Sequence, residues 1–157
     1  MTSDERRMHM GKIKSKDTKP ECLVRKLCRS LGYPGYRLHR RDIAGCPDIS
    51  FVSKRKAIFV NGCFWHGHIC KNGLRRPKSN RSYWYSKIAA NQERDIRIAD
   101  TLSENGWKVL IIWECQLKEI DKVVERLKFF LSSESSNDQM QNTGAEGNDN
   151  PQITARF

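Results

Sequence analysis

The stretch of sequence that decides the fold is AIFVNGCFWHGHIC, residues 57–70. It begins with four apolar residues, Ala57 to Val60, which predict a short buried strand. Gly62 ends the strand, and the loop after it holds two cysteines, two histidines and an adjacent Phe-Trp pair. Loops at strand ends carry the chemistry of many α/β proteins. Thiolates and imidazoles this close together predict a zinc site, and the aromatic pair offers flat faces on which bases can stack.

A second strand precedes this one. Residues 49–52 (Ile-Ser-Phe-Val) predict a strand, and the polar link 54–56 to strand 57–61 predicts an antiparallel hairpin. The hairpin would bring Asp48, at the entry of the first strand, close to Val60. An aspartate after a proline is ordinarily a turn former, and that alternative stays open for Asp48.

A third strand follows further along the chain. Residues 107–113 (WKVLIIW) are the clearest strand of the sequence and predict a central one. A long helix over about residues 82–105 separates it from strand 57–61, and strands joined by a helix pair in parallel. The pairing brings Cys115, just after the last strand, towards the cysteines of the loop after strand 57–61.

Two shorter helices complete the predicted α/β domain. Thr18-Lys19-Pro20-Glu21 predicts a helix start, with a threonine N-cap and a capping-box glutamate, and this helix should end near Gly32. Capping alone explains Glu21, so a further role for it stays open. A last helix is expected over about residues 120–131. Between them, residues 33–41 predict a strand edge or a loop, in which His39 is interpreted as a surface histidine.

Charge divides the chain into three parts. The sequence has 29 Lys and Arg against 18 Asp and Glu, a net charge of +11, yet residues 132–157 hold four acids and one base. The basic part favours a polyanionic partner, most simply nucleic acid, although a basic surface can also serve solubility alone. We expect a flexible basic arm over 1–17, the folded domain over 18–131 and a disordered acidic tail over 132–157.

The sequence shows no apolar run long enough to cross a membrane and no secretory signal, which predicts a cytoplasmic protein without membrane contact. Cysteines in such a chain are core thiols or metal ligands rather than disulfides. Four residues would form a closed zinc set: Cys63, His68, Cys70 and Cys115. A closed set leaves no position for water, so the zinc would be structural. Core thiols and a surface histidine are the alternative.

Two further residues are of chemical interest. His66 is left outside the predicted zinc set, so the metal would fix its place while leaving it free to titrate. Asp95 falls on the core-facing stripe of helix 82–105, together with Trp84, Ile88 and Asn91. A carboxylate on such a stripe needs a partner to offset its desolvation, and we interpret Asp95 as directed at a histidine or a base.

Five motifs occur in order between about residues 5 and 131: TKPE (18–21), GCPD (45–48), VNGCFWHGHIC (60–70), YW (83–84) with NQERD (91–95), and GW (106–107) through WEC (113–115). Their order and spacing resemble the very short patch repair DNA mismatch endonucleases. The resemblance implies a restriction-endonuclease-like core, an α/β fold with a mixed sheet flanked by helices and one structural zinc site. It also implies magnesium-dependent nicking of one DNA strand 5′ to the thymine of a T:G mismatch, which arises when 5-methylcytosine deaminates.

The resemblance implies a role for each matching residue. Asp48 would bind Mg²⁺, with the backbone carbonyl of Val60 as a second protein ligand. His66 would be the general acid or base, oriented by Asp95, and Glu21 would hold metal-bound water. The zinc ligands would be the four residues named above, and three aromatics would wedge into the base stack beside the mismatch: Phe64, Trp65 and Trp84.

The sequence lacks one motif that is usual in restriction nucleases. The acidic-x-Lys motif of restriction nucleases is missing, because the strand reads Phe59-Val60-Asn61, so His66 would have to replace the lysine. The expected partner is double-stranded DNA with a mismatch, acted on by a monomer at the bacterial nucleoid, with contact to other mismatch-repair proteins. Two rival functions stay open: a nuclease of the same fold with another DNA target, and a non-catalytic, zinc-stabilised DNA-binding module.

Overall fold

The computed structural model describes residues 2, 4–5, 8 and 15–134. Most of the predicted arm and nearly all of the predicted tail lie outside these residues. The described chain forms a mixed sheet of four strands in the order β1-β2-β3-β4. The strands are β1 (Arg37–Leu38), β2 (Ile49–Phe51), β3 (Lys56–Asn61) and β4 (Lys108–Trp113). The predicted α/β class is therefore confirmed.

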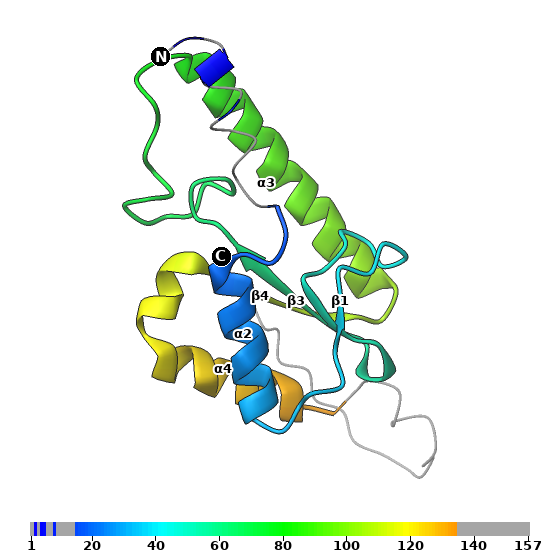
Figure 1. Cartoon of the computed structure of the whole chain (residues 1–157). Coiled ribbons are helices and arrows are strands. Elements are labelled where there is room, and N and C mark those ends of the chain that lie inside the picture. Colours follow the sequence, from blue (N-terminus) through cyan, green and yellow to red (C-terminus); the bar gives the residue numbers. More distant parts are fainter. Residues whose placement is uncertain (1, 3, 6–7, 9–14, 135–157) are drawn as a thin grey trace, which may run out of the picture.

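Helices of the described chain cover both faces of the sheet (Figure 1). They are α2 (Lys19–Ser30), α3 (Arg81–Glu104) and α4 (Ile120–Ser132). Helices α2 and α4 lie together on one face and α3 lies on the other (Figure 1). The core on the first face packs both helices against the sheet through Val24, Cys28, Ile49, Phe51, Ile58, Ile112, Val123, Leu127 and Leu131. Ala57 and Leu102 belong to a smaller core under α3. Alternate residues of β3 therefore serve opposite faces.

The strand pairings predicted from the sequence are confirmed. Strands β2 and β3 pair antiparallel, with Ile49 opposite Ile58, and β3 pairs with β4 in parallel, with Val60 opposite Ile112. The start of α2 is also as predicted, because the Thr18 hydroxyl accepts a hydrogen bond from the Glu21 N–H at 3.4 Å. Among the described residues, none of the helices has the length and apolar character needed to span a bilayer.

The prediction that β4 is a central strand is wrong. In the described part of the chain β4 lies at the edge of the sheet and pairs with β3 alone. Its apolar sequence has another cause: Ile112 belongs to the core under α2 and α4, while Val109 and Trp107 pack on the core under α3. A strand covered on both faces has the composition of a central strand wherever it lies in the sheet.

The link between β2 and β3 lies one residue earlier in the chain than predicted. Val52 lies in a short 3-10 helix, Val52–Lys54, rather than in the strand, and Lys56 already belongs to β3. The Lys56 side chain is fully buried, and its ammonium donates to the carbonyls of Leu131, at 3.1 Å, and Ser133. These carbonyls at the end of α4 have no partner within the helix and carry the negative end of its dipole, so they stabilise a buried cation.

Candidate active site and metal centre

A cavity of about 810 Å³ opens where the end of β3, the start of α2 and the middle of α3 meet. Its lining holds four acids, Glu21, Asp48, Asp95 and Glu114, and one base, Arg94. His66 and Trp65 from the loop after β3 also line it. Such a concentration of carboxylates repels a polyanion and attracts metal cations. The cavity therefore has the character of a cation-binding site within a chain of strongly basic composition.

Asp48 lies at the open end of the β2–β3 hairpin, close to Val60, as predicted. Its Oδ2 accepts a hydrogen bond from the Val60 N–H at 2.7 Å, which ties the carboxylate to β3. Burial raises the pKa of Asp48 to about 6; the Val60 hydrogen bond opposes this shift and the negative charge of Glu21 adds to it. Burial of an unneutralised carboxylate is costly, and a bound cation would remove much of that cost.

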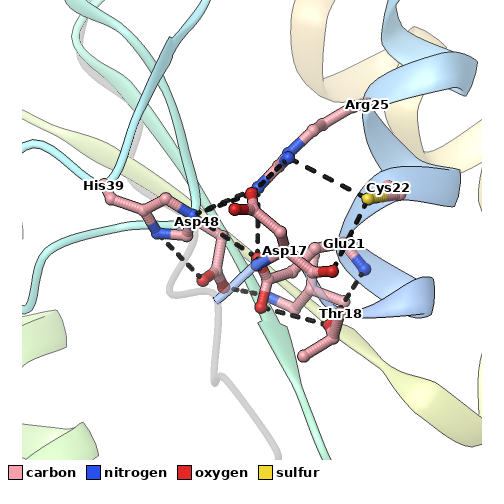
Figure 2. Close-up of polar contacts among 8 residues, drawn as sticks. Asp17, Thr18, Glu21, Cys22, Arg25, His39 and Asp48 are labelled. Atoms are coloured by element: carbon pink, nitrogen blue, oxygen red, sulfur yellow. Dashed lines mark hydrogen bonds and ion pairs between the residues drawn. The ribbon is translucent and has the colours of Figure 1, made fainter. Parts of the chain in front are cut away.

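Glu21 lies in a compact polar cluster next to Asp48, shown in Figure 2. The buried carboxylate of Glu21 accepts from the Thr18 hydroxyl at 3.1 Å and from the Asp17 N–H at 2.9 Å. It also forms an ion pair with Arg25 at 3.2 Å. The predicted capping role is thus present in a modified form, since the carboxylate reaches the N–H of Asp17, one residue before the cap. Capping and a place in the cavity are both fulfilled by this one side chain.

His39 belongs to the same cluster, so its interpretation as a surface histidine is wrong. Its side chain is only 15% exposed, with Nε2 at 3.1 Å from Arg25 and Nδ1 at 3.9 Å from Asp48 Oδ1. Strand pairing accounts for this position, because Leu38 lies opposite Ile49 and the residues that follow and precede this pair, His39 and Asp48, are thereby brought close together. The pairing of β1 was the signal that could have found His39. The i,i+4 spacing of Glu21 and Arg25 was a signal for their ion pair, whereas the contacts of Arg25 with Asp17 and His39 depend on segments outside α2.

His66 and Asp95 form a close pair across the cavity. His66 Nδ1 lies 2.5 Å from Asp95 Oδ2, so Asp95 is directed at a histidine as predicted. Asp95 also forms a longer ion pair with Arg94, at 3.9 Å, while Arg97 pairs with Glu93 at 3.0 Å. Because Nδ1 donates to the carboxylate, Nε2 is the nitrogen left for the cavity.

Helix α3 fixes the backbone around His66 as well. Asn91 Nδ2 donates to the Trp65 carbonyl at 2.8 Å, and Gln92 Nε2 donates to the Gly67 carbonyl at 3.3 Å. Gly67 has a φ of +61°, a left-handed conformation in which a side chain would also collide with Ile88 and Gln92. Three consecutive loop residues are therefore held by one face of α3, which places the imidazole rigidly.

The four predicted zinc ligands gather at one point, where the loop meets the end of β4. They are Cys63, His68, Cys70 and Cys115, and their ligand atoms lie within 4.8 Å of one another. His66 is not part of this group, as predicted. The donor set of three thiols and one imidazole fits a tetrahedral metal, and the cluster can hold a metal ion. Clustering of this kind argues against the alternative of unrelated core thiols.

Local contacts shift the pKa values of two of the thiols in opposite directions. The Gly73 N–H and then His68 lower the pKa of Cys70 to about 6, toward the thiolate that binds metals. Burial raises the pKa of Cys63 to about 12, so this thiol needs a cation beside it to ionise. His68 is also fixed, because its ring stacks on Trp113 with centroids 4.3 Å apart. A metal would thus join the loop after β3 to the end of β4.

The three predicted DNA-contacting aromatics form one partly exposed group beside the cavity. The ring centroids of Phe64 and Trp65 are 5.2 Å apart, those of Phe64 and Trp84 are 5.3 Å apart, and those of Trp65 and Trp84 are 5.8 Å apart. Exposed Tyr83 extends the group by an edge contact with Trp84. The structure thus brings together the loop after β3 and the start of α3. Flat rings on a rigid surface are suited to stack on bases.

Comparison with known proteins relates most of the chain to DNA-nicking enzymes. The family model described as DNA mismatch endonuclease Vsr matches residues 1–72. The type II nicking enzyme V.XorIIP of Xanthomonas oryzae pv. oryzae is 45% identical over 131 residues, which cover 83% of this chain and 95% of the relative. The corresponding enzyme V.NmeAIP of Neisseria meningitidis is 44% identical, over 80% of this chain and 89% of its own. The DNA mismatch endonuclease Vsr of Escherichia coli K12 is 34% identical over a stretch that covers 88% of this chain and 91% of the relative.

Proposed function

The chain belongs to the Vsr family of DNA mismatch endonucleases, and we propose from this premise that it nicks one strand of duplex DNA 5′ to the thymine of a T:G mismatch, with Mg²⁺ as cofactor. The observation that carries the proposal is the meeting of Asp48 and the His66–Asp95 pair in one acidic cavity beside an aromatic surface. A cation-binding carboxylate, a positioned imidazole and a stacking surface are the parts that strand cleavage at a distorted base pair needs.

The metal would be held by Asp48, with the backbone carbonyl of Val60 as second ligand. Mg²⁺ keeps several of its waters and needs few protein oxygens, so one carboxylate and one carbonyl fit it. When bound, it would stabilise the negative charge that develops on the cleaved phosphodiester. Because the pKa of Asp48 is about 6, its carboxylate is ionised at neutral pH and ready for a cation. Glu21, in the same cavity, would hold water on that ion.

His66 would transfer the proton. Its Nδ1–H is engaged by Asp95, which fixes the tautomer and leaves Nε2 to accept or donate a proton in the cavity. A histidine suits this task at neutral pH because its ordinary pKa lies near 6.5. It would replace the lysine of restriction nucleases, whose acidic-x-Lys motif is absent from a strand that reads Phe59-Val60-Asn61. We also propose, from the family and from the mixed sheet flanked by helices, that the core is restriction-endonuclease-like.

The Cys/His cluster is proposed to hold structural zinc. Three thiols and an imidazole complete a tetrahedral set and leave no position for a reacting water. When bound, zinc would fix the loop that carries His66 and the aromatic group. This assignment separates the two metals by chemistry, because zinc prefers the sulfur ligands and magnesium the oxygen ligands of the cavity.

The aromatic group is proposed to open the duplex at the mismatch. Inserting side chains between base steps costs a few kcal/mol per step, and a mismatched pair is easier to unstack than a matched one. Phe64, Trp65 and Trp84 could therefore select a T:G pair without reading every base. A monomer acting on mismatched DNA at the bacterial nucleoid, with contact to other repair proteins, stays part of this proposal.

A nuclease with a different target is the second candidate, because relatives at 45% and 44% identity are named type II nicking enzymes. One experiment tests both. A labelled duplex carrying T:G, the matched pair or another mismatch in one sequence context is incubated with the protein and Mg²⁺. We expect a single nick 5′ to the mismatched thymine, lost in Asp48→Ala and His66→Ala proteins that remain folded. Equal nicking of the matched duplex would favour the second candidate.

The third possibility, a DNA-binding module without catalysis, has a separate signature. Such a protein would bind the T:G duplex and leave it uncut in every divalent metal. The His66–Asp95 pair argues against this reading, because a partly buried histidine–carboxylate pair at a cavity has no evident use in DNA binding alone.

A further inference from the structure

A second group of cation ligands lies beside Asp48. One ligand atom each from Asp17, Glu21 and His39 lies within 4.8 Å of the others. Two carboxylates and an imidazole are a ligand set for a divalent ion such as Mn²⁺. His39 Nδ1 is also 3.9 Å from Asp48 Oδ1, so this group adjoins the site proposed for magnesium. The described structure thus contains two adjacent positions suited to cations.

The position between these three ligands is already occupied by a cation of the protein itself. The guanidinium of Arg25 contacts all three: Asp17 Oδ1 at 2.7 Å, Glu21 Oε2 at 3.2 Å and His39 Nε2 at 3.1 Å. Figure 2 shows this guanidinium among the three side chains. The Arg25 side chain is only 9% exposed, and among the described residues its Nε is buried without a hydrogen-bond partner. Within the part of the chain that the structure describes, the two terminal nitrogens of Arg25 contact these three residues and, more weakly at 4.0 Å, Cys22 Sγ.

We propose that Arg25 is the resident cation of a second cation subsite, formed by Asp17, Glu21 and His39, and that it excludes a divalent ion from this position. A guanidinium and a divalent ion compete for the same carboxylate oxygens, and the covalently attached one cannot dissociate. Its N–H also requires His39 Nε2 to be an acceptor, so the proton of His39 lies on Nδ1, the nitrogen nearer to Asp48.

The subsite has a consequence that rests on the proposed function. Glu21 lies near Asp48, and the fixed charge of Arg25 holds the Glu21 carboxylate in place. An ion in place of the guanidinium would bind Glu21 directly and withdraw it from water on the ion at Asp48. Arg25 would thus be a positioning residue for Glu21. The second terminal nitrogen of its guanidinium would also hold Asp17, which lies just before α2, next to Glu21.

Metal binding in the absence of DNA tests the inference. The purified protein, Arg25→Ala, Arg25→Gln and the control Arg29→Ala are titrated with Mn²⁺ alone, and free Mn²⁺ is counted by electron paramagnetic resonance. Arg29 lies one turn further along α2, over the ring of Tyr36, and contacts none of the three ligands. We expect both Arg25 variants to bind one more Mn²⁺ per chain than the parent, and Arg29→Ala to bind the same number. Pulsed electron paramagnetic resonance should detect a nitrogen of His39 bound to the additional Mn²⁺. This nitrogen signal should disappear when His39→Ala is combined with Arg25→Ala.

An Arg25 variant that is folded and binds no more Mn²⁺ than the parent would overturn the proposal. Arg25→Gln guards against misfolding, because its amide keeps donors for the carboxylates and adds an oxygen ligand. Failure of both variants to fold even with excess Mn²⁺ would overturn it as well, since an ion able to replace the guanidinium would stabilise the folded state. The count uses no DNA, so a parent that fails to nick T:G duplexes would disprove the proposed function and leave this test intact.

Discussion

His66 Nδ1 lies 2.5 Å from Asp95 Oδ2, across the gap between the loop after β3 and helix α3. This contact joins two segments that are 29 residues apart in the sequence, and it decides which nitrogen of the imidazole faces the cavity. The proposed chemistry depends on it, because only a fixed Nε2 can exchange a proton with the reacting groups.

Asp95→Asn should therefore slow nicking with little loss of stability. An amide at this position can donate to Nδ1 and stabilise the wrong tautomer, so we expect a fall of about 100-fold, within the range for general acid–base groups. Single-turnover nicking of the T:G duplex measures it, and the pH profile of the residual rate should change in shape. Glu93→Gln is the matched control, because Glu93 lies on the same helix and, among the described residues, forms an ion pair with exposed Arg97 alone. A parental rate in Asp95→Asn would show that the pair is structural.

Asp48 gives a pH-dependent prediction for stability. Its pKa is raised from 3.8 to about 6 by burial, so the folded state favours the protonated acid. The stabilisation from the neutral form is complete below pH 3.8 and is lost as the pH rises through about 6. At neutral pH the ionised carboxylate costs up to about 3 kcal/mol when no metal is bound. Asp48→Asn should therefore be more stable than the parent at pH 7.5, in buffer without magnesium.

The stability gain of Asp48→Asn should shrink as the pH falls and vanish near pH 4, as measured by thermal unfolding at several pH values. Asp42→Asn is a control of opposite sign: the Arg40 side chain lowers the pKa of exposed Asp42, so its charged form is the favoured one. A constant difference in stability between the parent and Asp48→Asn at all pH values would contradict a partly buried, ionised carboxylate at this position.

Zinc content and stability should depend on Cys115. We expect the purified protein to carry one zinc per chain by elemental analysis, and Cys115→Ser to lose it and melt at a lower temperature. Removing one ligand opens the closed set and frees the loop after β3 from β4. Cys46→Ser is the matched control, because Cys46 is exposed and lies outside the ligand group. Stoichiometric zinc in Cys115→Ser would show that the metal lies elsewhere or that three ligands suffice.

The sequence predicted those parts of the site that follow from local patterns. The hairpin placed Asp48 beside Val60, and the βαβ connection placed Cys115 beside the loop cysteines, because each rule needs only strand order. The helical stripe likewise directed Asp95 to a histidine. These contacts follow from periodicity and chain topology, so they could be predicted without any knowledge of packing.

Other contacts depended on packing between distant segments. Strand β1 has two residues, too few to show an alternating pattern, so the pairing of β1 with β2 that brings His39 close to Asp48 was not apparent. Lys56 is buried because its ammonium meets a carbonyl 75 residues away, at the end of α4, which no local signal indicates. The edge position of β4 could not be predicted either, because helices cover both faces of this strand and give it the composition of a central strand.

Trp84→Ala should reduce discrimination between mismatched and matched DNA. Trp84 lies at the start of α3 and contacts both Phe64 and Trp65, so its loss removes one ring of the group and the support of the other two. Unstacking at a base step costs a few kcal/mol, so we expect nicking of the T:G duplex to fall at least about 10-fold. A fluorescent base analogue beside the mismatch should report less unstacking in this variant. Tyr85→Ala is the control, since Tyr85 is exposed on the same helix and contacts Arg76. If Trp84→Ala opens and nicks the mismatch like the parent while Tyr85→Ala does not, the duplex is opened by another surface of α3.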